Sequence, residues 1–116
     1  MTRIAYVNGR YHPRAEAMVD IEDRGYQLAD GVYEVVHLYG GRLVDEDLHL
    51  DRLDRSLREL RLPQPMTRAA LRHVLLEVAR RNRIRDGLIY MQITRGVARR
   101  EHAFPVHPIA PSLVVT

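Results

Sequence analysis

Apolar residues along this 116-residue chain recur with two periods, one typical of strands and one typical of helices. Residues 4–12 carry the dipeptide Asn8-Gly9 between short apolar runs, a combination that predicts a β-hairpin. A polar segment follows. Residues 17–21 then form either a short strand or an extended connection.

The next segment alternates turn residues with a strongly β-forming run. Glycine and Asp-Gly punctuation within residues 23–31 predicts one helical turn. Residues 32–39 are β-branched and aromatic, which predicts a strand. Gly40-Gly41 turns the chain back into residues 42–44, so a second hairpin is expected.

Two helices are predicted in the middle of the chain. Asp45 or Asp47 is placed to cap the first, and Pro63 and Pro65 end it. Its buried stripe has helical spacing and consists of Leu50, Leu53, Leu57 and Leu60. Thr67 is expected to cap the second helix. The apolar face of that helix consists of Leu71, Val74, Leu75 and Val78.

The C-terminal third returns to strands. Gly87 breaks the pattern, residues 88–94 read as a buried strand, and residues 113–115 start another after a proline-containing loop. Strands with two adjacent helices predict an α+β fold, a mostly antiparallel sheet with two helices packed on one face. The length fits one domain.

Composition narrows the classes of function. There is no cysteine, which excludes disulfides and thiolate metal sites and fits a reducing cytoplasm. No apolar run is long enough to span a membrane. The net charge of +3 does not point to nucleic acid, because arginines alternate with acids. The helical i,i+4 spacing of Asp51 with Arg55, and of Asp54 with Arg58, predicts ion pairs on a solvated face.

Candidate chemistry is concentrated in a cationic pair near the C-terminus. In an extended segment, Arg100 and His102 would project to the same side, where a guanidinium and an imidazole suit a carboxylate. The hydroxyl of Tyr33 could complete such a site. Spacing alone favours solvated loop residues for Arg100 and His102, and for Tyr33 a strand tyrosine packed in a sheet face.

Arg52 is the second candidate, offset by one from the leucine stripe of the first helix. An arginine there can reach a phosphate, or it can pair with an acid one turn away. His37 and His49 lack metal-ligand spacing, so no metal site is expected. Thr94-Arg95-Gly96 reads as the end of a strand.

Several longer motifs carry a resemblance to a known family. They are Asp23-Arg24-Gly25-Tyr26-Gln27, Asp30-Gly31-Val32-Tyr33-Glu34-Val35, His49-Leu50-Asp51-Arg52-Leu53, Thr94-Arg95-Gly96 and Arg100-Glu101-His102. Over nearly its whole length the chain resembles the N-terminal domain of class IV (fold type IV) pyridoxal phosphate enzymes. Within that class the Arg100-Glu101-His102 element is similar to that of the D-amino-acid transaminases, also called D-alanine aminotransferases.

The resemblance implies a role for each candidate residue. Arg52 would bind the phosphate of pyridoxal 5'-phosphate, and Tyr33, Arg100 and His102 would bind the substrate α-carboxylate. Arg100 and His102 would reach the neighbouring subunit of a homodimer. The implied reaction moves an amino group from a D-amino acid to a 2-oxo acid, with no nucleic acid and no membrane involved.

The chain contains no lysine: all 18 residues of its Lys+Arg count are arginine. Enzymes of this kind hold the cofactor as a Schiff base to a lysine amine. We therefore expect residues 1–116 to be the small N-terminal domain, inactive alone, with the lysine in a C-terminal domain absent from the chain. Alternatives are an aminodeoxychorismate lyase, a branched-chain or R-selective amine transaminase of the same fold, or a stand-alone non-catalytic dimerising domain.

Overall fold

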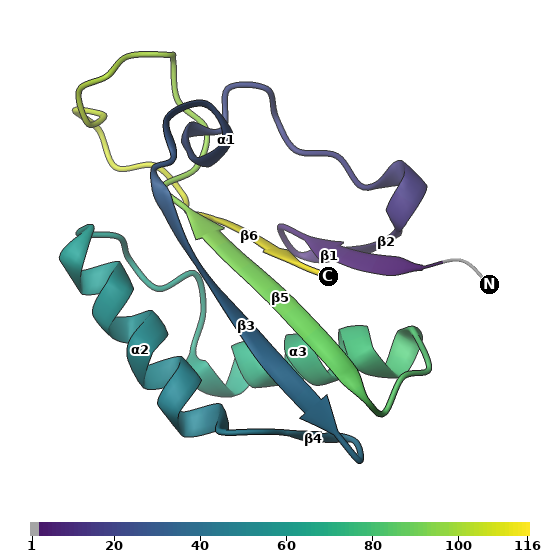
Figure 1. Ribbon diagram of the computed structural model, residues 1–116. Coiled ribbons are helices and arrows are strands. Elements are labelled where there is room, and N and C mark those ends of the chain that lie inside the picture. Colours follow the sequence, from purple (N-terminus) through teal and green to yellow (C-terminus); the bar gives the residue numbers. More distant parts are fainter. Residues whose placement is uncertain (1–2) are drawn as a thin grey trace.

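The computed structural model describes residues 3–116 and shows one sheet with helices against it (Figure 1). In chain order its elements are β1 (Ile4–Val7), β2 (Arg10–Pro13), the 3-10 helix η1 (Arg14–Glu16), α1 (Arg24–Leu28), β3 (Gly31–Tyr39), β4 (Arg42–Leu43), α2 (Glu46–Glu59), α3 (Arg68–Arg81), β5 (Gly87–Thr94) and β6 (Ser112–Val115). Both predicted hairpins and the predicted helical turn are confirmed, and residues 17–21 are a connection rather than a strand.

The six strands form an antiparallel sheet in the order β2-β1-β6-β5-β3-β4. β3 and β5 pair along their whole length, from Gly31 opposite Thr94 to Leu38 opposite Gly87. β4 pairs only with Leu38 and Tyr39, at the far end of β3. Within the described chain, the outer edge of β3 is therefore open near Gly31, at the end where α1 lies (Figure 1).

One face of the sheet packs against both long helices, as the α+β prediction required. Alternate strand residues supply the sheet side of the core, because side chains along a strand point to opposite faces. These residues are Tyr6, Val36, Leu38, Ile89, Met91, Ile93, Leu113 and Val115. The helix side consists of Leu50, Leu53, Leu57, Leu71, Val74, Leu75, Val78 and Ala79.

The ends of the helices follow the predicted signals only in part. Thr67 caps α3 by accepting a hydrogen bond of 3.1 Å from the Ala70 amide. Asp45 occupies the N-cap position of α2 in a left-handed conformation, and its side chain makes no capping bond. Leu60 lies just after α2 and is only half-buried, but it packs against the same core as Leu50, Leu53 and Leu57.

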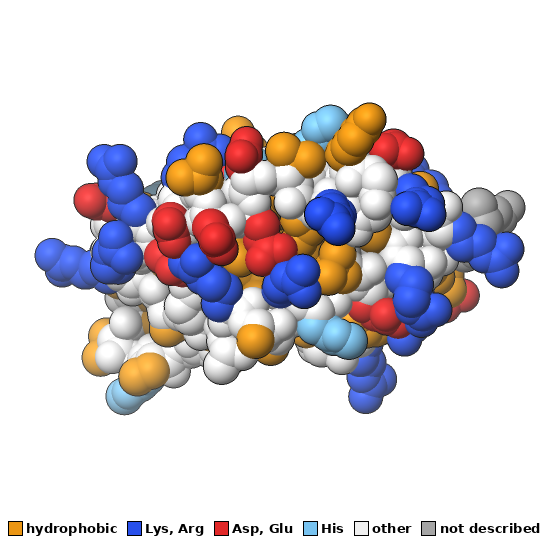
Figure 2. All heavy atoms as spheres, turned by 90° about the horizontal axis from the view of Figure 1, so that it is seen from below, with side chains coloured by type: hydrophobic (Ala, Val, Ile, Leu, Met, Phe, Trp, Pro, Cys, Tyr) orange, Lys and Arg blue, Asp and Glu red, His pale blue; other side chains and the backbone are white. Residues whose placement is uncertain are grey.

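The predicted ion pairs along α2 were wrong. Within residues 3–116, Asp51 and Asp54 do not pair with Arg55 and Arg58. Both accept hydrogen bonds from Nη2 of Arg68, at 2.8 and 2.6 Å, and thereby join α2 to the first residue of α3. Charges of both signs are interspersed on the face seen in Figure 2 rather than gathered in one basic patch.

The other face of the sheet carries no long helix. Its side chains include Tyr33, Val35, Tyr90, Gln92 and Val114, and Tyr33 is 62 % exposed. Leu88, predicted inside a buried strand, also lies on this face and is exposed. None of the helices within residues 3–116 combines the length and the apolar character needed to cross a membrane.

Candidate functional site

Tyr33 lies on the helix-free face of β3, beside the N-terminal end of the strand. Its ring stacks on that of Tyr90 in the neighbouring strand, with centroids 5.6 Å apart. A shallow hollow of about 270 Å³ adjoins it, lined by Gly25, Ala29, Gly31, Val32, Tyr33, Gln92 and Thr94. A larger hollow, of about 430 Å³ between β1 and α3, contains none of the candidate residues.

Arg52 is held by a partner that the sequence did not indicate. Glu34, the residue after Tyr33, is buried on the opposite face of β3 and points toward α2. Its carboxylate accepts two hydrogen bonds from Arg52, from Nε at 2.8 Å and from Nη2 at 2.9 Å. Nδ1 of His49 lies 2.7 Å from the same carboxylate. The alternative of an acid one turn away along α2 fails, because positions 48, 49, 55 and 56 carry no acid.

This arrangement fixes the charge on Glu34. Burial alone would raise the pKa of the carboxyl, but hydrogen bonds from Arg52 and His49 outweigh burial and lower it. The bonds to Glu34 in turn raise the pKa of Arg52. A carboxylate and a guanidinium that share two parallel bonds have a defined mutual orientation. Glu34 on β3 therefore fixes the orientation of the Arg52 guanidinium.

The chemistry of Arg52 fits an anion such as a phosphate. Its side chain is 67 % exposed despite the pairing with Glu34. Nη1 donates to no residue within 3–116 and remains available. Because Tyr33 and Glu34 are consecutive on β3 and face opposite sides of the sheet, Arg52 and Tyr33 lie on the two sides of the same end of β3.

Arg100 and His102 lie elsewhere, in the loop of residues 97–111 between β5 and β6. The segment is irregular, with bends at both residues, so the extended geometry expected for the pair is not formed. Both side chains are exposed, and within the described chain neither makes a hydrogen bond or ion pair. The structure therefore places Tyr33 and Arg52 on opposite faces of the same end of β3, and within residues 3–116 it joins neither of them to Arg100 or His102.

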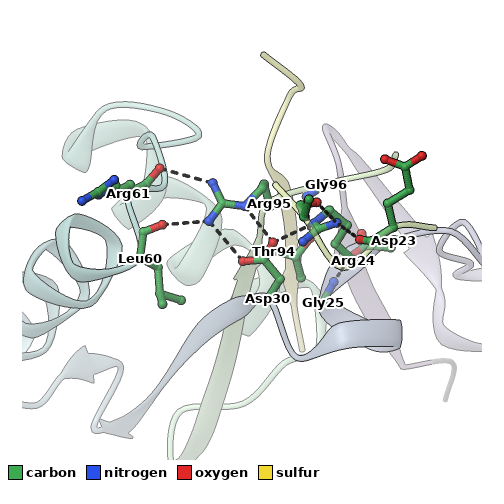
Figure 3. Close-up of polar contacts among 11 residues, drawn as sticks. Asp23, Arg24, Gly25, Asp30, Leu60, Arg61, Thr94, Arg95 and Gly96 are labelled. Atoms are coloured by element: carbon green, nitrogen blue, oxygen red, sulfur yellow. Dashed lines mark hydrogen bonds and ion pairs between the residues drawn. The ribbon is translucent and has the colours of Figure 1, made fainter. Parts of the chain in front are cut away.

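A buried ionic cluster links the elements that carry these residues. Asp30, directly before β3, accepts hydrogen bonds from Nε of Arg24 at 2.8 Å and from Nε of Arg95 at 2.7 Å (Figure 3). Arg24 and Asp30 are almost fully buried. Burial would raise the pKa of Asp30, but the bonds from Arg95 and Arg24 lower it overall.

Arg95 extends the cluster to the end of α2. Its Nη2 donates to the Leu60 carbonyl at 2.7 Å, and Nη1 lies 3.4 Å from the Arg61 carbonyl (Figure 3). These carbonyls have no partner inside the helix, so a cation at this end is favourable. The local sequence around Arg95 predicts only the end of a strand. Its role depends on Asp30, 65 residues away, which no local pattern shows.

Comparison with known proteins places the chain in a family. The sequence profile described as "Amino-transferase class IV" matches residues 31–116. This match covers most of the chain, including the strand with Tyr33 and Glu34, the helix with Arg52, and the loop with Arg100 and His102. The chain belongs to the class IV aminotransferase family.

Two curated relatives show which members of the family this chain is similar to. A D-alanine aminotransferase of Bacillus licheniformis is 46 % identical over 97 residues, which cover 84 % of this chain and 34 % of the relative. A D-alanine aminotransferase of Staphylococcus haemolyticus is 40 % identical over 114 residues, covering 98 % of this chain and 40 % of the relative. The chain thus spans well under half the length of these relatives.

Solved structures share the fold. A branched-chain amino acid aminotransferase from Escherichia coli superimposes with a TM-score of 0.88 at 18 % identity, over 99 % of this chain and 39 % of that one. The 4-amino-4-deoxychorismate lyase of Pseudomonas aeruginosa gives 0.77 at 30 % identity, over 97 % and 38 %. The predicted α+β domain of fold type IV is confirmed.

Proposed function

We propose that residues 1–116 are the N-terminal, substrate-binding domain of a pyridoxal-phosphate-dependent D-amino-acid transaminase. The reaction moves an amino group from a D-amino acid, such as D-alanine, to a 2-oxo acid. The observation that carries the proposal is Arg52, an exposed guanidinium whose orientation is fixed by the buried carboxylate of Glu34. The D-alanine aminotransferases among the relatives support the choice of substrate.

In this proposal, Arg52 binds the cofactor phosphate with the donors that Glu34 leaves free. Pyridoxal phosphate, when bound, supplies an electron-withdrawing ring that makes the bonds at the substrate Cα labile. Glu34 keeps the guanidinium from turning away, and Tyr33 borders the same edge of β3 from the other face. The fixed geometry means that little orientational freedom is lost when the phosphate binds.

Tyr33, Arg100 and His102 bind the substrate α-carboxylate. Since no contact joins Arg100 and His102 to Tyr33 within the described chain, we infer that they are delivered to the site of a second subunit, in a homodimer. Two parallel N–H donors of arginine match a carboxylate, and an imidazole and a phenol add further hydrogen bonds. Holding the carboxylate fixes which face of Cα is presented for reaction, which makes the site selective for one enantiomer.

The chain has no lysine, so the amine that holds the cofactor would come from a C-terminal domain beyond residue 116. Residues 1–116 alone are then expected to be inactive. A second candidate is aminodeoxychorismate lyase activity, favoured by the likeness to the lyase of Pseudomonas aeruginosa at 30 % identity.

One assay separates these functions in the full-length protein that contains this chain. Pyruvate is measured after mixing the protein with D-alanine and 2-oxoglutarate. Parallel reactions contain aminodeoxychorismate, which also releases pyruvate, or L-leucine or an R-amine, which give no pyruvate and are followed by the glutamate formed from 2-oxoglutarate. The proposal predicts that D-alanine is the best donor. Faster conversion of aminodeoxychorismate, or preference for L-leucine or the R-amine, would refute it.

A further inference from the structure

The loop of residues 97–111 is held to the rest of the domain by a small number of defined contacts. At its start, the Arg24 amide donates to the Gly96 carbonyl at 2.9 Å. Gly96 has a φ of +109°, and a Cβ there would lie 2.0 Å from the Ala110 carbonyl oxygen, so the two ends of the loop meet at this glycine. Between these ends, the loop has no regular secondary structure.

Arg24 holds the middle of the loop at the residues on either side of His102. Its Nη1 donates to the Glu101 carbonyl at 2.7 Å and to the Ala103 carbonyl at 3.2 Å. Within residues 3–116, no other side chain hydrogen-bonds to the segment 99–108. The Arg24 side chain is 4 % exposed and is itself fixed through Nε by Asp30.

Arg95 holds the loop a little further along, through Phe104. The Arg95 guanidinium carbon lies 4.1 Å from the centre of the Phe104 ring, and that of Arg24 lies 5.9 Å from it. A guanidinium over the face of an aromatic ring attracts that ring. The ring is therefore held in place if other contacts fix the guanidinium. The Arg95 guanidinium is fixed by its hydrogen bonds to Asp30 and to the Leu60 carbonyl at the end of α2.

We propose that Arg24 and Arg95, joined through Asp30, are positioning residues that set where the loop presents Arg100 and His102. This inference rests on the proposed role of those two residues in binding the substrate carboxylate. The same cluster touches the strand that carries Tyr33 and the helix that carries Arg52. The cluster therefore fixes the position of the loop relative to Arg52 and Tyr33. In the proposed homodimer, these two residues serve the subunit's own site, and the loop serves the site of the partner.

The chemistry favours arginine at position 24 for a specific reason. One side chain must neutralise a buried carboxylate and at the same time donate to carbonyls on a different segment. Guanidinium donors point in fixed, separate directions, whereas a lysine ammonium is a compact point charge. Arg24→Lys would keep a cation beside Asp30 and lose the simultaneous hold on the loop. It thus separates the positioning role from the neutralisation of Asp30.

The experiment uses the full-length protein and two independent readouts. Backbone ¹⁵N order parameters of Glu101, His102 and Ala103 report loop motion without any turnover. Steady-state KM and kcat for D-alanine report the carboxylate site. Arg24→Lys and Phe104→Ala release the loop from its two anchors, and Arg72→Lys is the matched control. Arg72 pairs with Glu46 between α3 and α2 and does not touch the loop.

We expect the order parameters to fall from about 0.8 to below about 0.6 in both test variants. KM for D-alanine should rise about tenfold or more, with kcat within about threefold and cofactor affinity unchanged, because the loop is misplaced rather than lost. Arg72→Lys should change none of these. If Arg24→Lys does not fold, Phe104→Ala still decides, because its side chain is largely exposed.

Unchanged order parameters in the folded variants would overturn the inference, and so would a loosened loop with an unchanged KM. Arg100→Ala, measured in parallel, shows which claim has failed. If KM stays unchanged in Arg100→Ala, the carboxylate role itself is wrong. If KM rises in Arg100→Ala but not in Arg24→Lys or Phe104→Ala, only the positioning role is wrong.

Discussion

Arg52 and Glu34 share two hydrogen bonds, of 2.8 and 2.9 Å, across the interface between α2 and β3. The pair leaves Arg52 largely exposed while its direction is fixed by a buried acid. In the full-length protein, Arg52→Ala should therefore weaken pyridoxal phosphate binding by about one order of magnitude or more, because a charged hydrogen-bond donor is lost. Titration of apoprotein with the cofactor, followed by absorbance, measures the effect.

Glu34→Gln should weaken cofactor binding less than Arg52→Ala, since it frees the guanidinium without removing it. Arg58→Ala is the control, because Arg58 lies on the same helix, is exposed and pairs with no described residue. An equal loss of affinity in Arg58→Ala would mean that general positive charge, rather than the fixed Arg52, attracts the phosphate.

The buried acid Asp30 makes stability depend on pH. Its pKa is lowered in the folded protein by Arg95 and Arg24, in spite of burial. The pKa of an aspartate carboxyl in the unfolded chain is near 3.8. Because the folded pKa of Asp30 is lower, its charge stabilises the fold fully at pH values above 3.8, and this contribution is lost as the pH falls through the folded pKa. Asp30→Asn should therefore lower the urea midpoint clearly at pH 7.

At about pH 3 the gap between wild type and Asp30→Asn should be smaller, because pH 3 lies below the unfolded pKa of 3.8: the unfolded carboxyl has largely taken up its proton, and the advantage of the lowered folded pKa shrinks. Glu59→Gln serves as control, since Glu59 is exposed and pairs with no described residue. A gap that stays constant from pH 7 to pH 3 would show that the charge on Asp30 does not stabilise the fold.

The leucine stripe of α2 provides a test of the core. Leu53 is 1 % exposed, so Leu53→Ala should lower the free energy of unfolding by about 2–5 kcal/mol. Leu48 lies on the same helix but is 68 % exposed, and Leu48→Ala should cost less than about 0.5 kcal/mol. Urea denaturation followed by circular dichroism measures both. Similar losses for the two leucines would mean that α2 is packed through a different face.

Local signals predicted the elements of the fold well. Asn8 and Gly9 have φ values of 46° and 99°, the positive angles that a two-residue hairpin turn requires. Thr67 caps its helix as its position implied. The predicted cap at Asp45 was only half right: Asp45 occupies the N-cap position, but its backbone is left-handed, with φ of 53°, and its side chain makes no capping bond.

The support of the candidate site could not be predicted in the same way. Glu34 is one residue from Tyr33, but only the burial of one face of β3 shows that it points at Arg52. Arg24 bonds to the Glu101 carbonyl 77 residues away, a contact set by how the loop returns to α1. Such partners depend on strand pairing and loop path, which hydrophobic periodicity does not encode.

The carboxylate role of Arg100 is tested most directly by comparing Arg100→Ala with Arg99→Ala in the full-length protein. The two arginines are adjacent in the same exposed loop, so they differ in position rather than in charge. The measurement is KM for D-alanine together with the dissociation constant of pyridoxal phosphate. We predict that Arg100→Ala raises KM about tenfold or more and leaves cofactor binding unchanged, while Arg99→Ala alters KM less than about twofold. An unchanged KM in Arg100→Ala, or loss of the cofactor instead, would contradict the account.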